Sequence, residues 1–399
     1  MKRVGNLMEK IASMPNIELA DNKARLHKEK RYGVQKHDKN REEENRLLLE
    51  ALILGKYKTS PYKTFKIYEP KERLIFRLPY YPDRITHHAI LNLLEPIWVK
   101  TFIANSYSCI KGRGIQAAYY GVKKSLRDIE GTKYCLKVDI KKFYPSLDHD
   151  ILFNTLKKKI KDSKLLALLK EIIDSNEQGV PIGNYLSQFF ANLYLTDIDH
   201  KIKEVLRIKH YHRYADDMVF LASTKEELRR VLEWLKEALA EIKLELKANY
   251  QIFPVESRGI DFVGFVFFHN YIKLRKSIKH RIRKLINRYK SGEIQIDSFK
   301  RSISAYYGWL QYCNSKHYLQ KIYDQTGINL IAWLGEKSII SKFYNKNIRV
   351  VVIDKRPKYY KVNIIYHSKP YSFRSAARFW EKYVNHKNFD ILIKHGKTN

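Results

Sequence analysis

The run HYHRYADDMVFLA (residues 210–222) places two adjacent aspartates, Asp216 and Asp217, between two stretches of β-forming residues. Such flanks predict a strand, a tight turn and a second strand, with the acidic pair at the turn. Carboxylates held at a turn can bind hard cations such as Mg²⁺. Because Asp also favours turns for backbone reasons, this pair by itself indicates only a hairpin.

A third aspartate, Asp139, lies upstream in KYCLKVDIKKFYPSLDHDIL (residues 133–152). Apolar residues alternate over 134–140, which predicts a strand with Asp139 near its end. A Pro-Ser turn follows, and a helix is expected from Asp148 to Ile160 with Asp148 as its cap. Asp139 would then face the hairpin turn across a cleft. Three carboxylates meeting there could hold two Mg²⁺ ions, with Mn²⁺ as a substitute, which is the standard arrangement for in-line phosphoryl transfer.

The charge of the chain points to a polyanionic partner. Among 399 residues, Lys and Arg number 76 against 42 Asp and Glu, a net charge of +34. A soluble surface needs only a modest net charge, so nucleic acid is the better explanation, although the charge does not distinguish RNA from DNA. Aromatic residues make up 13 % of the chain and add rings on which bases could stack.

The remaining composition indicates a globular protein with two or three domains and a large core, since 44 % of the residues are hydrophobic. The sequence has no run of 18 apolar residues, so we expect no membrane span. The first residues lack a secretory hydrophobic core, and three scattered cysteines fit a reduced compartment. These features favour a cytoplasmic location.

Hydrophobic periodicity predicts a mixed order of helices and strands. We expect two helices in 1–56 separated by a basic stretch, a β-hairpin over 57–79, helices over 83–98, 111–130 and 224–242, strands near 252 and over 262–267, and basic helices over 273–327. Thr224 with Glu227 forms a capping box. The last 64 residues (336–399) carry 15 Lys and Arg against four Asp and Glu, a net charge of +11. Short strands around Arg356-Pro357 and a helix over 373–383 are expected there.

Five blocks in this order resemble the reverse transcriptases: YEPKERLIFRLPYYPDRITHHAIL, SYSCIKGRGIQAA, KVDIKKFYPSLD, RYADDMVFLA and KLELKANYQIFPVESRGIDFVGF. The resemblance covers about residues 25–330. It implies an α+β right-hand polymerase fold, with N-terminal helices and fingers (1–130, with part of the palm), a ferredoxin-like palm (131–272), a helical thumb (273–335) and a small basic α+β extension (336–399). Nucleic acid would run through the cleft, and the bound partners would be template RNA, cDNA and deoxynucleoside triphosphates.

One further block resembles a narrower group. In GVPIGNYLSQFFANLYL, Ile182 and Gln188 stand where most reverse transcriptases have Gln and Pro. An Ile-Gly-x-x-x-Ser-Gln pattern is typical of reverse transcriptases from diversity-generating retroelements, which are bacterial or phage-encoded. The resemblance implies error-prone copying of a template-repeat RNA into cDNA, with errors opposite adenine, and a small basic accessory variability protein as a partner.

The resemblance also implies roles for individual residues. Asp139 and Asp216 would be the principal metal ligands, with Asp217 in support and the backbone carbonyl of Ile140 completing one metal shell. The other candidates are nucleotide-binding or assisting residues: Lys71 and Arg73 for the triphosphate, Tyr144 as the steric gate against a 2′-hydroxyl, Ile182, Gly183 and Gln188 lining the pocket of the nascent pair, Arg113 near the template, and Lys247 in proton transfer.

Four of these candidates have a plainer alternative. Lys71 and Arg73 could be surface charge at a turn, Tyr144 a core aromatic residue, and Arg113 a helix-capping residue. At the level of the whole protein, the alternatives are another prokaryotic reverse transcriptase of the retron, group II intron or phage-defence type, or a catalytically dead RNA-binding protein of the same fold. The intact set of three aspartates argues against a dead enzyme.

Overall fold

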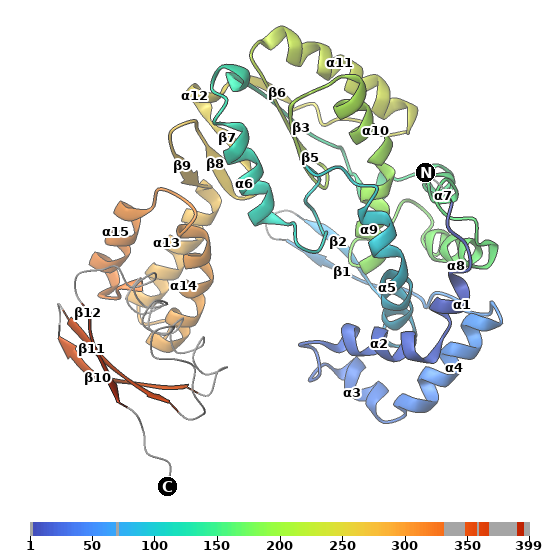
Figure 1. Ribbon diagram of the computed structural model, residues 1–399, viewed down its shortest axis with the longest axis horizontal. Coiled ribbons are helices and arrows are strands. Elements are labelled where there is room, and N and C mark those ends of the chain that lie inside the picture. Colours follow the sequence, from blue (N-terminus) through green and yellow to red (C-terminus); the bar gives the residue numbers. More distant parts are fainter. Residues whose placement is uncertain (1–2, 69–71, 331–347, 357–358, 367–388, 395–399) are drawn as a thin grey trace. The chain divides into compact units, whose positions relative to one another are not determined.

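The computed structural model describes residues 3–68, 72–330, 348–356, 359–366 and 389–394 (Figure 1). The chain divides into two compact units, Met1–Lys273 and Leu274–Asn399. Runs of helices and groups of strands follow one another along the chain, in an α+β fold. None of the helices in the described part of the chain is both long and apolar enough to cross a membrane.

The N-terminal region contains four helices where the sequence predicted two: α1 (Met8–Ile11), α2 (Met14–Arg25), α3 (Tyr32–Asp38) and α4 (Arg41–Ile53). The predicted basic spacer thus holds helix α3, which buries only Val34 and His37. So few buried residues give a weak helical periodicity, which explains why the sequence did not indicate α3. Helix α2 begins with Pro15 in its first turn and packs against α5 (Ile85–Val99).

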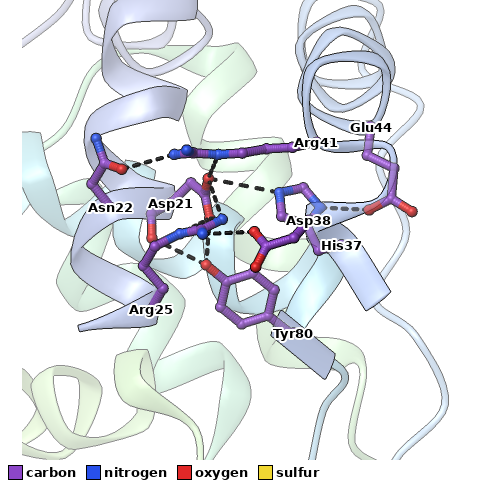
Figure 2. A network of polar contacts seen from close by, with 8 residues as sticks. All are labelled: Asp21, Asn22, Arg25, His37, Asp38, Arg41, Glu44 and Tyr80. Carbon is purple, nitrogen blue, oxygen red and sulfur yellow. Dashed lines mark hydrogen bonds and ion pairs between the residues drawn. The ribbon is translucent and has the colours of Figure 1, made fainter. Parts of the chain in front are cut away.

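A buried carboxylate joins three of these helices to the segment Tyr80–Arg84 (η1), as Figure 2 shows. Asp21 on α2 accepts hydrogen bonds from Arg25 at 3.0 Å, from Arg41 at 2.5 Å and from the Tyr80 hydroxyl. His37 on α3 lies 3.7 Å from the same carboxylate and bonds Glu44 on α4 at 2.5 Å. The Asp21 network therefore fixes the N-terminal helices on the chain that follows the first hairpin.

The predicted hairpin over 57–79 is confirmed as β1 (Lys63–Ile67) and β2 (Arg73–Arg77), which pair antiparallel. Its side chains are largely exposed. One backbone hydrogen bond attaches it to a distant loop, since the Phe76 N–H donates to the Ile182 carbonyl at 2.9 Å.

The central sheet has four antiparallel strands in the order β4-β5-β3-β6, namely His210–Tyr214, Asp217–Ala222, Tyr134–Asp139 and Gln251–Pro254. Helix α11 (Lys225–Glu241) packs on β3, β5 and β6. As the capping box predicted, α11 starts after Thr224, whose hydroxyl accepts from the Glu227 N–H at 3.3 Å. Alternating apolar residues of β3 and β5 belong to one core with α5, α7, α9 and α11.

The helices between β3 and β4 are α7 (His149–Lys157), α8 (Ser163–Asp174), α9 (Tyr185–Tyr194) and α10 (Thr196–His200). Asp148 caps α7 through the Ile151 N–H at 3.0 Å, as predicted. The expected helix over 111–130 is shorter, α6 (Ile115–Ser125). The expected strand over 262–267 is a hairpin, because positive φ angles at Val263 and Gly264 break it into β7 (Ile260–Phe262) and β8 (Phe265–Phe267). Short elements α12 (Val255–Arg258) and β9 (Ile272–Leu274) complete this part.

The described residues of the second unit form three helices and a three-stranded sheet. The predicted basic helices are confirmed as α13 (Lys276–Lys290), α14 (Ile296–Leu310) and α15 (Lys316–Thr326). Strands β10 (Ile348–Arg356) and β11 (Tyr359–Tyr366) form the expected antiparallel hairpin, and β12 (Phe389–Lys394) adds in parallel to β11. The helix expected over 373–383 lies outside the described residues. The division into fingers, palm, thumb and extension stays a prediction.

Candidate active site

The structure brings the three aspartates together at one end of the central sheet. Asp139 ends β3 and is the cross-strand partner of Asp217, the first residue of β5. Asp216 lies in the turn between β4 and β5, and its carbonyl accepts from the Ile140 N–H at 3.3 Å. The strand-turn-strand and the upstream strand predicted from the sequence are therefore confirmed, together with the meeting of Asp139 and the acidic pair.

Burial and mutual repulsion act on these carboxylates. Burial raises the pKa of Asp216, and the neighbouring Asp139 carboxylate raises it further. Burial also raises the pKa of Asp217 to about 6, although the Lys137 ammonium, 3.3 Å away, opposes this effect. The Oδ1 atom of Asp217 is buried and has no hydrogen-bond partner. Such a group of carboxylates fits a bound cation. The cation would offset the repulsion between the negative charges and would give the buried Asp217 oxygen a partner.

The roles of the three aspartates as metal ligands stay a prediction. Within the ranges that the structure describes, no group of three or more His, Cys, Asp or Glu side chains is spaced to hold a metal ion. Two carboxylates are instead engaged by lysines, Asp139 by the Lys247 ammonium and Asp217 by that of Lys137. The donor set consists of carboxylate oxygens alone, which suits hard divalent cations.

Two lysines thus contact the aspartates, and the sequence indicated only one of them. The Lys247 N–H also donates to the Asp139 carbonyl at 2.8 Å, so the chain around Lys247 runs alongside the end of β3. Lys137 precedes Asp139 by two positions on β3, and it also donates to the Asp261 carbonyl. The alternation of side chains along a strand places residues 137 and 139 on one face, a signal that could have revealed Lys137.

Tyr144 lies just beyond Asp139, in the short turn Tyr144–Ser146, and is half-buried. Burial raises the pKa of the Tyr144 hydroxyl. The nearby Cys109 thiol and Asp216 carboxylate raise this pKa further. The Tyr144 carbonyl accepts from the Val180 N–H at 3.0 Å, so Tyr144 contacts the loop that carries Ile182. The backbone of Tyr144 therefore lies between Asp139 and the Ile182 loop in the chain that forms the site.

The Ile182–Gly183 segment precedes helix α9 and lies against β2. Ile182 is half-buried, and Gly183 has a φ of +122°. A Cβ atom at Gly183 would lie 2.5 Å from the Phe76 carbonyl oxygen, closer than real contacts allow. Glycine is therefore required here by its own backbone and by the hairpin. Gln188 lies in the first turn of α9 and is half-buried.

The remaining candidates have mixed outcomes. Arg73 is exposed at the start of β2, opposite Ile67. Lys71 lies outside the described residues. The Arg113 guanidinium donates to the carbonyls of Ile103 and Ser106, at 2.6 and 2.9 Å, and so holds its own loop. It makes no capping bond to α6, whose N-cap is Gly114.

Sequence reasoning missed Arg213, which lies on β4 three residues before Asp216. Its side chain is fully buried and forms a bidentate ion pair with Asp199 on α10, at 2.6 to 3.0 Å. In the sequence Arg213 reads as one polar residue in a strand, and Asp199 as one of many charges on helices. Only the fold shows that the two are enclosed together.

Comparison with known proteins places this site in a family. Residues 66–267, just over half of the chain, match the family described as "Reverse transcriptase (RNA-dependent DNA polymerase)". This range contains β2, the Ile182 loop and all three aspartates. The chain belongs to the reverse transcriptase family. The protein is an RNA-directed DNA polymerase, and reverse transcriptase domains generally use divalent metal ions.

Several bacterial relatives are similar to more than half of this chain. The retron Ec73 reverse transcriptase of Escherichia coli is 27 % identical over 232 residues, which cover 54 % of this chain and 72 % of that protein. Protein YkfC of Escherichia coli K12 is 25 % identical over 280 residues, covering 58 % and 72 %. The group II intron-encoded protein LtrA of Lactococcus lactis is 24 % identical over 225 residues, covering 53 % of this chain and 37 % of LtrA.

Among solved structures, telomerase from Candida albicans in complex with a TWJ fragment of telomeric RNA aligns with a TM-score of 0.45 at 13 % identity, covering 70 % of this chain and 61 % of that one. Apo telomerase from Candida tropicalis aligns with a TM-score of 0.42 at 14 % identity, covering 55 % and 49 %. The chain thus spans less than two thirds of each telomerase chain.

Proposed function

We propose that this reverse transcriptase copies a template-repeat RNA into error-prone, adenine-mutagenised cDNA, as the enzymes of diversity-generating retroelements do. The observation that carries the proposal is the segment Ile182-Gly183-x-x-x-Ser187-Gln188, which resembles the pattern of those enzymes. The segment lies beside β2 and near Tyr144, in the same unit as the three aspartates.

For the chemistry, Asp139 and Asp216 would hold the catalytic divalent ions, with Asp217 and the Ile140 carbonyl in support. Two Mg²⁺ ions, when bound, supply activation of the attacking 3′-hydroxyl and stabilisation of the leaving pyrophosphate. The protein's own part is to hold the carboxylates at the end of the sheet. Lys247 lies beside Asp139 and would assist proton transfer, and Arg73 with Lys71 would contact the triphosphate.

Two side chains would select the nucleotide. Tyr144 would act as the steric gate below the sugar. Ile182 would face the nascent base pair, where it can pack but cannot donate or accept a hydrogen bond. A pocket that discriminates only by packing separates alternatives by ~1–3 kcal/mol per contact, which permits errors. The other partners would be template RNA, cDNA and a small basic accessory variability protein.

The decisive experiment is primer extension by Ile182→Gln and wild-type protein on one RNA template, followed by sequencing of the cDNA. Ile182→Gln should reduce misincorporation opposite template adenine more than opposite the other bases. The matched control is Ile75→Val, a half-buried position of β2 that keeps an apolar side chain. An unchanged error spectrum in Ile182→Gln would remove the argument for this group of enzymes.

A second candidate function is that of a retron or group II intron-type reverse transcriptase, which the similarity to the retron Ec73 enzyme and to LtrA favours. An enzyme of that kind should copy adenine about as accurately as the other bases. The same sequencing therefore distinguishes the two. A template repeat and a variable repeat beside the gene would support the first candidate.

A further inference from the structure

The buried guanidinium of Arg213 reaches the turn that carries Asp216. Its Nη1 atom donates to the Ala215 carbonyl at 3.1 Å and to Oδ1 of Asn192 on α9, also at 3.1 Å. Its Nε and Nη2 atoms are engaged by Asp199. One side chain therefore connects helix α10, helix α9 and the residue immediately before Asp216.

The conformation of that residue explains why a fixed donor is useful there. Ala215 has a φ of +56°, in the left-handed region that a side chain with a Cβ disfavours. The turn nevertheless contains alanine, so surrounding contacts must hold it. The Arg213 hydrogen bond to the Ala215 carbonyl is such a contact, and it comes from a side chain with no exposed surface.

The arginine is itself held firmly. Tyr211 donates to Asp199 at 2.7 Å, which leaves that carboxylate fully engaged by buried donors. The Arg213 backbone pairs with the segment before α6, since its N–H donates to the Asn105 carbonyl at 3.0 Å and its carbonyl accepts from the Tyr107 N–H at 3.1 Å. Backbone and side chain are thus fixed independently.

We propose that Arg213 is a positioning residue for polymerisation: anchored by Asp199, it keeps Ala215 in its left-handed conformation and so places Asp216 beside Asp139. This inference rests on the proposed role of Asp139 and Asp216 as metal ligands. Lysine could not replace the arginine, because one ammonium cannot reach Asp199, Asn192 and the Ala215 carbonyl in the fixed fork geometry of a guanidinium.

The test is a double-mutant cycle of Arg213→Lys and Ala215→Gly, measured by single-nucleotide primer extension on an RNA template. Arg213→Lys should lower kcat about 100-fold, the size of a misplacement of about 1 Å, with the KM for the nucleotide little changed. Glycine adopts a positive φ freely, so Arg213→Lys should matter much less in a chain that already carries Ala215→Gly. The kcat of the double variant should therefore lie close to that of Ala215→Gly alone. Additive effects, or a wild-type kcat for Arg213→Lys, would overturn the proposal.

The control is Arg25→Lys in the Asp21 network (Figure 2), where another arginine bonds both oxygens of a buried aspartate. It should lower the melting temperature and leave kcat unchanged. An equal loss of kcat in Arg25→Lys would mean that Arg213 only supports the fold.

If Arg213→Lys does not accumulate as folded protein, the pair Arg213→Gln with Asp199→Asn removes both buried charges together and leaves neither alone. It should fold and still show the loss of kcat; a wild-type kcat would overturn the proposal. Asp216→Asn is measured alongside. Activity of Asp216→Asn would refute its role as a metal ligand, which is a separate outcome from the Arg213 cycle.

Discussion

At the scale of single residues, the site combines acidic groups that repel one another with lysines that offset the repulsion. Asp216 has a raised pKa because it is buried and lies near Asp139, while Lys137 and Lys247 contact the other two carboxylates. This balance lets the aspartates remain close together before any ion binds. A cation bound between them would then gain from charges that the fold already holds in place.

Replacing Asp216 by Asn should therefore abolish nucleotide incorporation and leave RNA binding nearly intact. The carboxylate serves the chemistry, whereas the basic surface binds phosphates. We expect the rate to fall by at least about 1,000-fold, part of the ~8–23 kcal/mol by which enzymes lower barriers. Primer extension and a filter-binding titration measure the two effects.

The control is Asp197→Asn, since Asp197 forms an exposed ion pair with Lys158 at 2.6 Å. Such pairs contribute only ~0–1 kcal/mol, so activity should not change. Near-normal extension by Asp216→Asn would contradict the assignment of the site.

Site residues could be predicted from the sequence where their role depends on neighbouring residues in the chain. Asp139 and the Asp216-Asp217 pair were predictable because a strand end and a hairpin turn are local patterns, and the resemblance supplied their pairing. Arg213 and Asp199 were not, because an ion pair enclosed between β4 and α10 follows from packing that no periodicity encodes. Gly183 was predicted to line the pocket of the nascent pair, but its contact with Phe76 required the structure.

At the scale of elements, strand β2 of the hairpin lies directly against the loop before α9. The Phe76 N–H bonds the Ile182 carbonyl at 2.9 Å, and Gly183 lies against the Phe76 carbonyl. Because Arg73 lies on the same hairpin, a displacement of β2 would move the proposed triphosphate contact. The loop and the hairpin should act together in nucleotide binding.

Gly183→Ala should therefore raise the KM for the nucleotide, in addition to any loss of stability. The added methyl group meets the Phe76 carbonyl and a φ of +122°, so β2 must shift. Steady-state primer extension and thermal melting measure the two quantities.

The control is Gly55→Ala, at a φ of +67° with nothing within 4 Å of the added atom. It should cost about 1–2 kcal/mol of stability and leave the KM unchanged. Equal KM values for Gly183→Ala and wild type would show that the contact has no bearing on the nucleotide.

The Asp21 network makes a second prediction for elements, concerning pH. Burial would raise the pKa of Asp21, but hydrogen bonds from His37, Tyr80, Arg25 and Arg41 outweigh it and lower the pKa well below its usual range. A depressed pKa in the folded state contributes stability above the unfolded value near 3.9, and this stability is lost as the pH falls further.

Asp21→Asn should thus destabilise the protein by about 3–5 kcal/mol at pH 7, since it breaks a buried network around charged arginines. The difference from wild type should narrow below about pH 4, where the Asp21 carboxylate of the unfolded chain takes up a proton while that of the folded protein stays ionised. Thermal melts at several pH values measure this. A difference that stays constant down to pH 3 would contradict the depressed pKa.

Helix caps made some elements predictable and their absence hid others. Thr224 and Asp148 marked the starts of α11 and α7 correctly, because capping side chains act locally. Helix α3 has no side-chain cap and few buried residues, so it was missed. The turn at Val263-Gly264 was missed because a valine at positive φ is not expected from its propensity.

At the scale of the whole molecule, the net charge of +34 is spread over both units. Residues 336–399 carry +11 of it, and a charge of this density favours nucleic acid as their partner. Their strands β10 and β11 form the hairpin expected around Arg356-Pro357. A cap whose charges are only solvated remains the alternative, and the salt dependence of RNA binding distinguishes the two.

Replacing Lys355, Arg356 and Lys361 by Gln should flatten that salt dependence. Each phosphate contact steepens the slope of log K against log salt by ~0.7–0.9, so the loss of three contacts should reduce it by ~2–3. Substitution is preferable to truncation after Gly335, because residues Leu274–Asn399 form one compact unit.

The control replaces Lys158, Lys170 and Lys236, which already pair with carboxylates at 2.6 to 2.9 Å and should leave the slope nearly unchanged. If the first variant keeps the wild-type slope and short-primer extension, residues 336–399 do not contact the RNA phosphates through this hairpin.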